Sequence, residues 1–125
     1  MSTGDAPIPP IGEFITFLYV EDLERSDRFY GGLLGLPLVI DQGGCRVFRV
    51  AGEAYLGICE RPGQCQPDGL IVTFVSPDVD DWHRRLVAAG IAVEQEPADN
   101  DTYRLYHAFY RDPDGYLVEI QRFWD

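Results

Sequence analysis

The sequence has no long hydrophobic run, few cysteines and few basic residues. No apolar stretch approaches the roughly 18 residues that a membrane helix needs, so we predict no membrane partner. The first dozen residues lack the basic start and apolar centre of a signal peptide. We therefore interpret residues 1–12 as a polar N-terminal tail and expect a cytoplasmic protein.

The cysteines are only three, Cys45, Cys59 and Cys65. They are odd in number and form neither a CxxC pair nor a zinc-spaced cluster, which argues against a disulfide framework and against structural zinc. Two interpretations remain open for them. They are small buried or loop side chains, or one of them is a reactive thiol.

Positive charge is scarce, with 10 Lys and Arg against 21 Asp and Glu. The net charge of −11 and the pI of about 4.4 imply that phosphate backbones are repelled, so we expect no nucleic-acid partner. A cationic ligand would be attracted. The alternative is that the acidic surface serves only solubility.

What is present suits a single globular domain. The chain has 125 residues, of which 46% are hydrophobic and 13% aromatic. A chain of this size buries a sizeable core, and we expect one domain over residues 13–125.

The order of the expected elements repeats itself. Module one (13–62) and module two (69–123) are separated by a turn-rich stretch, 61–69, and each is predicted as strand, helix and three strands. An offset of 55 residues aligns Val20 with Val75 and Gly35 with Gly90. We expect strands at 14–20, 38–40, 45–50, 54–60, 70–75, 91–95, 104–111 and 116–123, helices at 22–34 and 77–89, and a polar loop at 97–101. His83, in the second helix, is expected at the surface.

The strongest local signal is the last hairpin, which turns at Asp112-Pro113-Asp114-Gly115. Proline presets one turn dihedral and glycine supplies a positive φ. In the strand that follows, alternation places Val118 and Ile120 on one face and Glu119 on the other.

These residues also carry a resemblance. The pattern FxxDPDGxxxE over residues 109–119, together with YVEDLERSDRFY over 19–30 and LLGL over 33–36, resembles the glyoxalase, bleomycin-resistance and extradiol-dioxygenase group, the vicinal oxygen chelate superfamily. The resemblance implies an α+β fold of two tandem βαβββ modules whose curved mixed sheets enclose a cavity. It says less about activity, because one fold hosts many chemistries.

Metal-dependent members of that group resemble one another in placing ligands on the first and last strands of each module. Carried over to this sequence, Glu119 keeps an acidic ligand, whereas Leu70, Ile15 and Gly57 occupy the other three positions. One carboxylate does not hold a divalent ion tightly, so we expect no metal or other cofactor. The alternative is a rearranged divalent-metal site formed by His107, Glu119 and the thiolate of Cys59.

Strand parity predicts the side chains that line the cavity. They form an apolar, aromatic wall with few polar groups, as in many small-molecule sites. The expected ligand-binding residues are Phe17, Tyr19, Tyr55, Gly57, Cys59, Leu70, Phe74, His107, Phe109 and Glu119; Ile15, Val72, Leu105, Leu117 and Gln121 are also expected to face inward. His107 and Glu119 are the candidate catalytic residues, and the alternative is that each is a buried polar residue satisfied by its neighbours.

The branch of the superfamily that lacks metal ligands includes antibiotic-binding resistance proteins that resemble homodimers. We therefore predict a homodimer that binds an aromatic or cationic small molecule and confers resistance by sequestration. The alternatives are a lyase, isomerase or dioxygenase that uses a rearranged metal site or a His107/Glu119 acid-base pair, and an accessory domain without a ligand. Trp124 is expected to stack on a ligand or to pack at the dimer interface.

Overall fold

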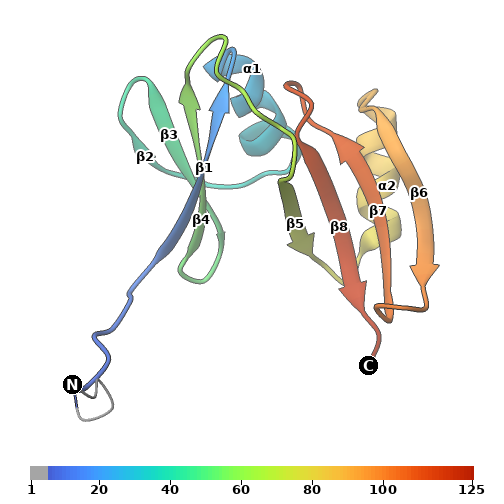
Figure 1. The fold of residues 1–125 in the computed structure, drawn as a ribbon. Coiled ribbons are helices and arrows are strands. Elements are labelled where there is room, and N and C mark those ends of the chain that lie inside the picture. The colour runs from blue at the N-terminus through green and yellow to red at the C-terminus, as the bar shows by residue number, and fades with distance from the viewer. Residues whose placement is uncertain (1–5) are drawn as a thin grey trace.

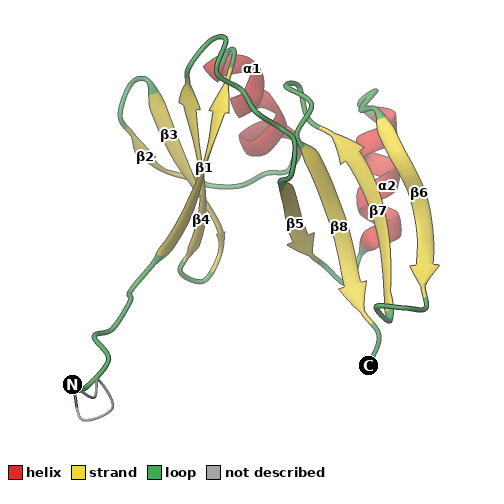
Figure 2. Ribbon diagram, in the orientation of Figure 1, coloured by secondary structure: helices red, strands yellow, loops and turns green. Residues whose placement is uncertain are grey.

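The computed structural model describes residues 6–125 and shows two four-stranded sheets with few helices (Figures 1 and 2). The strand order is β1-β4-β3-β2 in the first sheet and β5-β8-β7-β6 in the second. The expected α+β fold of two βαβββ modules is thus confirmed. The elements are β1 (Phe14–Val20), α1 (Leu23–Asp27), η2 (Arg28–Leu33), β2 (Leu38–Asp41), β3 (Cys45–Ala51), β4 (Ala54–Glu60), β5 (Ile71–Val75), α2 (Val79–Ala88), β6 (Val93–Asn100), β7 (Leu105–Arg111) and β8 (Leu117–Phe123).

In both sheets the first strand of the module pairs in parallel with the last, and the remaining pairs are antiparallel. The first helix begins where expected, because the Asp22 carboxylate accepts a hydrogen bond from the backbone N–H of Arg25. It ends as a wider π-helical turn, η2, which buries Phe29 and Tyr30.

The prediction of a polar loop at 97–101 is wrong. β6 continues to Asn100, and its pairing with β7 shifts register between Gln95 and Ala98, around Pro97. Proline has no N–H to donate to a ladder and is tolerated on an edge strand, which β6 is. β6 therefore continues through Pro97, although proline normally interrupts a strand.

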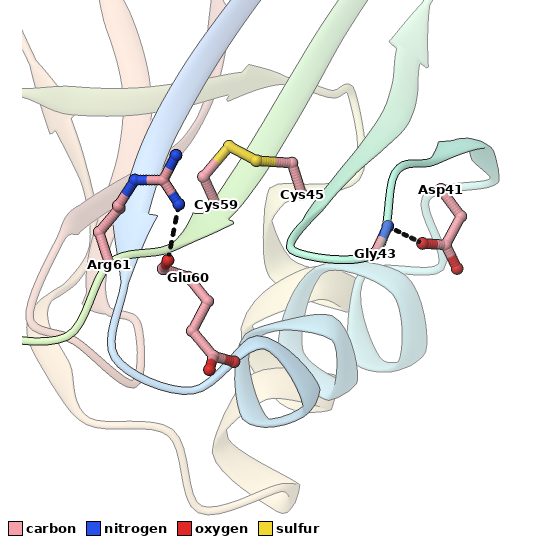
Figure 3. Close-up of a disulfide and its surroundings, with 6 residues drawn as sticks. All are labelled: Asp41, Gly43, Cys45, Cys59, Glu60 and Arg61. Atoms are coloured by element: carbon pink, nitrogen blue, oxygen red, sulfur yellow. Dashed lines mark hydrogen bonds between the residues drawn. A yellow bond between two sulfur atoms is a disulfide. The ribbon is translucent and has the colours of Figure 1, made fainter.

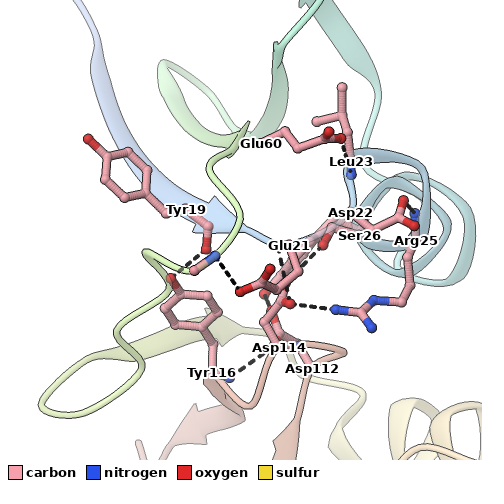
Figure 4. Close-up of polar contacts among 12 residues, drawn as sticks. Tyr19, Glu21, Asp22, Leu23, Arg25, Ser26, Glu60, Asp112, Asp114 and Tyr116 are labelled. Carbon is pink, nitrogen blue, oxygen red and sulfur yellow. Dashed lines mark hydrogen bonds and ion pairs between the residues drawn. The ribbon is translucent and has the colours of Figure 1, made fainter.

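One hydrophobic core spans both modules, and polar contacts reinforce the junction (Figure 4). The buried Tyr30 donates its hydroxyl hydrogen to Asp112 Oδ2 over 2.6 Å, although the two residues are 82 positions apart. The guanidinium of Arg25 lies 2.5 Å from Asp114. Tyr116 donates its hydroxyl hydrogen to the backbone oxygen of Tyr19 over 2.6 Å. The DPDG turn of module two is thus fixed to the first helix and strand of module one.

The described part of the N-terminal tail, residues 6–12, contains no helix or strand, and the chain runs away from the sheets before β1 (Figure 1). Its isoleucines, Ile8 and Ile11, are almost fully exposed. Residues 1–5 of the predicted tail lie outside the described residues. Among residues 6–125, no helix is long and apolar enough to cross a membrane.

Candidate functional site

Each sheet has one face against the helices and an opposite face, which we call the open face. In module one the parity of β1 and β4 is as expected, since Phe17 pairs with Gly57 and Tyr19 with Cys59, while Leu18 and Ile58 are buried in the core. In module two the open face carries His107 and Phe109 of β7 and Leu117, Glu119 and Gln121 of β8.

The expected face of β5 is wrong. Val72 and Phe74 pair with Val118 and Ile120 and pack against the core, whereas Thr73 pairs with Glu119 on the open face. Thr73 therefore corresponds to Phe17, which is an offset of 56 residues (73 − 17) instead of 55. A slip of one residue moves every side chain of a strand to the other face.

Three side chains from three strands form a polar chain on the open face of module two. Thr73 donates its hydroxyl hydrogen to Glu119 Oε1 over 2.8 Å, and His107 Nδ1 lies 2.6 Å from Glu119 Oε2. His107 and Glu119 are buried, at 7% and 8% exposure. The strands around them hold the pair in place, and an acidic acceptor next to an imidazole can fix its tautomer.

The donors of this region do not fit a divalent ion. Among the described residues no group of three His, Cys, Asp or Glu side chains could hold a metal ion. Both oxygens of Glu119 already have hydrogen-bond partners, and Ile15 and Gly57 offer no donor side chain. We derive no step through a metal.

Cys59 forms a disulfide with Cys45 (Figure 3). The argument against a disulfide among the cysteines is therefore wrong, and so is the alternative that the Cys59 thiolate binds a metal. The two residues are direct partners in the β3–β4 ladder, with Cα atoms 4.1 Å apart. A thiolate of Cys59 is therefore not available to a metal or a substrate. Cys65 is free, but burial raises the pKa of its thiol to about 11, so it is not an activated thiol.

The open face of module one is aromatic and partly exposed. Phe17 and Tyr19 are 47% and 44% exposed. The ring of Phe17 lies on Gly57, where a Cβ atom would overlap it. Gly57 therefore makes room for an aromatic ring of its own module. The Arg61 guanidinium lies 5.8 Å from the centre of the Tyr19 ring.

Three cavities of about 410, 400 and 320 Å³ lie where the two modules meet. Leu70 and Phe74 line them, although they do not share the face of Glu119, and so do Phe17, Tyr19 and Tyr55. Gly57, Cys59, His107, Phe109 and Glu119 line none of these three. Thr73 lines two of them and connects the junction to Glu119.

The prediction that His83 is a surface residue is wrong. Its Nδ1 lies 2.6 Å from the hydroxyl of the fully buried Tyr110, and its Nε2 lies 2.7 Å from Glu96. The imidazole thus fixes α2 to β6 and β7 on the face opposite the site. Trp124 donates its indole N–H to Asp99, which orients it at the end of the sheet.

Comparisons with known proteins agree with this fold. A family model described as the Glyoxalase/Bleomycin resistance protein/Dioxygenase superfamily matches residues 11–120. The chain is 28% identical over 120 residues to the uncharacterized protein YraH of Bacillus subtilis (strain 168), covering 84% of this chain and 93% of that protein.

Solved structures with a similar fold include these two. A lactoylglutathione lyase from Agrobacterium tumefaciens has 26% identity and a TM-score of 0.73, with coverage of 91% of this chain and 95% of that one. A glyoxalase-related enzyme from Fulvimarina pelagi has 22% identity and a TM-score of 0.73, with coverage of 86% and 85%. The module order, the DPDG hairpin and the family match together place this chain in the Glyoxalase/Bleomycin resistance protein/Dioxygenase superfamily.

Proposed function

We propose that the protein is a homodimer that binds an aromatic or cationic small molecule against the open face of module two, without a metal. The observation that carries this proposal is the Thr73–Glu119–His107 chain, in which His107 and Glu119 are buried on a face otherwise made largely of apolar side chains. Small-molecule sites characteristically combine apolar walls with a few well-placed polar groups.

The open faces support the dimer. In one chain they leave large apolar side chains uncovered; half or more of Ile71, Val75 and Phe123 is exposed. Contiguous exposed apolar surface marks an interaction site. A second copy whose module one covers module two would bury these side chains and add the aromatic Phe17 and Tyr19 to the site.

Charge supports the ligand class. The net charge of −11 attracts cations, and the aromatic side chains of the open faces suit flat rings. Sequestration of such a compound in the cytoplasm would give resistance to a toxic drug. The Cys45–Cys59 disulfide counts against a cytoplasmic location, since disulfides are rare in reducing compartments.

A second candidate is acid-base catalysis, and the short contact between His107 and Glu119 favours it. A carboxylate that accepts the Nδ1 hydrogen leaves Nε2 as a base, which removes a proton from a bound substrate. The 26% identity to a lactoylglutathione lyase is consistent with a lyase or isomerase. In this candidate Glu119 positions His107.

A panel of cationic and polyaromatic compounds tests the binding proposal, read out by melting temperature and tryptophan fluorescence. A compound at 100 times its Kd should stabilise the protein by about 2.7 kcal/mol. We expect Glu119→Gln to weaken binding and the exposed Asp101→Asn, which removes the same charge elsewhere, to leave it unchanged. No stabilisation by any compound contradicts the proposal.

Two further measurements test the remaining parts. Sedimentation equilibrium should give a dimer, and a monomer at high concentration contradicts the shared site. Elemental analysis after incubation with nickel, manganese, iron or zinc and then dialysis should give far less than one metal per chain; stoichiometric retention contradicts the metal-free proposal.

A further inference from the structure

Gln121 is a buried polar side chain whose amide has no hydrogen-bond partner among residues 6–125. It is 7% exposed on the open face of module two, next to the His107–Glu119 pair. Its amide makes no hydrogen bond to any residue among 6–125, and neither amide atom is sealed from solvent. Buried polar groups are normally paired. The amide is therefore aimed at the open face with its donor and acceptor unused.

His107 presents a second unused group beside it. An ionised carboxylate only accepts hydrogen bonds, so the contact with Glu119 Oε2 places the imidazole hydrogen on Nδ1. In the neutral imidazole, Nε2 then carries a lone pair. It makes no hydrogen bond within the described part of the chain and is likewise not sealed from solvent. Thr73 fixes the other carboxylate oxygen, so the pair does not swing away.

The two groups are direct neighbours, because His107 and Gln121 are partners in the β7–β8 ladder. Side chains at such positions start about 5 Å apart. One ligand can therefore reach both. It would give a hydrogen to His107 Nε2, and an adjacent carbonyl or amide would pair with the Gln121 amide.

Aromatic side chains flank this pair. The Phe109 ring lies edge-on to the His107 ring, with centres 4.8 Å apart. Phe123 follows Gln121 by two residues on the same face and is 57% exposed. Both are placed to contact the faces or edges of a flat ring.

The subsite lies beside strand β5, two residues of which line the module junction. Val75, the β5 partner of Gln121, and Thr73, the partner of Glu119, both line the cavity of about 400 Å³. β5 is the edge strand of the second sheet, so no further strand covers this side of the subsite.

We propose that His107 and Gln121 form a subsite that selects flat aromatic ligands bearing an O–H or N–H next to a carbonyl. The inference rests on the proposed binding function and deepens it by naming the ligand class. Gln121 is the specificity-determining residue, and Glu119 acts on the ligand only through His107.

The test compares 3-hydroxy-2-naphthamide with 3-methoxy-2-naphthamide by calorimetry on the full-length protein. The two probes differ in the hydrogen offered to His107. We expect the methoxy compound to bind at least tenfold more weakly to the wild type, and Gln121→Leu to lower the affinity for the hydroxy compound at least tenfold. Gln42→Leu, at an exposed turn, should change nothing.

The melting temperature of Gln121→Leu gives a second readout that needs no ligand. Because the amide has no partner among the described residues, its removal should leave the melting temperature unchanged or raise it. A clear fall would show a structural role and overturn the inference. Equal affinities for the two probes, or no binding of the hydroxy probe, would overturn it as well. If cationic dyes still stabilise the protein in a Glu119-dependent way, the inference alone fails; if no compound does, the proposed function fails too.

Discussion

The Cys45–Cys59 disulfide should make a large contribution to stability that reductant or a single substitution removes. The bond joins residues 14 positions apart and closes the β3–β4 hairpin. In the chain-entropy model, closing a loop of this length stabilises the fold by about 3 kcal/mol. For a domain of this size that corresponds to a fall of about 10 °C in melting temperature on reduction.

Urea denaturation and thermal melting, with and without reductant, measure this contribution. Cys45→Ser and Cys59→Ser should each cost as much as the double variant, because all three remove the same bond. Cys65→Ser is the matched control and should keep the full response to reductant, since Cys65 is free. Thiol titration of the unreduced, unfolded protein should find one thiol. Three thiols, or a melting temperature that does not respond to reductant, would refute the disulfide and the reasoning from hairpin pairing.

Three further changes probe the junction and the open face. Tyr30→Phe leaves the buried Asp112 without one donor and should cost about 1–3 kcal/mol in urea denaturation; no loss would mean that the contact is not a constraint. Burial raises the pKa of Asp112 above its ordinary value of 3.8, so the Asp112 carboxyl adds to the stability of the fold below pH 3.8, and this added stability is lost as the pH rises through the folded pKa. The free energy of unfolding of the wild type, measured relative to Asp112→Asn, should therefore fall as the pH rises from 3.8 through the folded pKa. A rise over that range would contradict the burial argument. Gly57→Ala displaces the Phe17 ring and should weaken dimerisation in sedimentation with little change in melting temperature, whereas a well-formed dimer would show that Phe17 lies outside the interface.

The fold could be predicted from the sequence because its signals are local. The DPDG turn fixes the β7–β8 hairpin, and alternation in β8 places Glu119 on the open face, as the structure confirms. The strand expected at 70–75, which contains β5, gave no such signal, since it is apolar at almost every position. The side chains of this strand that face the site had to be inferred from the 55-residue offset between the modules. Because the true offset is 56, the inference assigned Thr73, the polar residue in that run, to the wrong face.

The disulfide was missed for a different reason. Counting cysteines and checking known spacings ignores strand pairing, whereas the expected strands 45–50 and 54–60, folded about Gly52, already bring Cys45 opposite Cys59. The role of His83 could not be found this way, because its contact with Tyr110 depends on how α2 lies across the sheet. Helix-to-sheet packing leaves no short-range pattern in a sequence.

The duplicated positions explain why the site belongs to module two. In the ladder of module one Gly57 occupies the place of Glu119, and the pair Cys45–Cys59 occupies the place of His107–Gln121. In module one this pair is joined covalently and the glycine is covered by Phe17, so the corresponding positions offer an aromatic surface with neither an imidazole nor an amide. Module two keeps an imidazole and an amide with unused hydrogen-bonding capacity at the same positions. If the two surfaces face each other in a dimer, module one of one chain contributes apolar contacts and module two of the other contributes the hydrogen-bonding groups. Each ligand is then bound by residues from both chains.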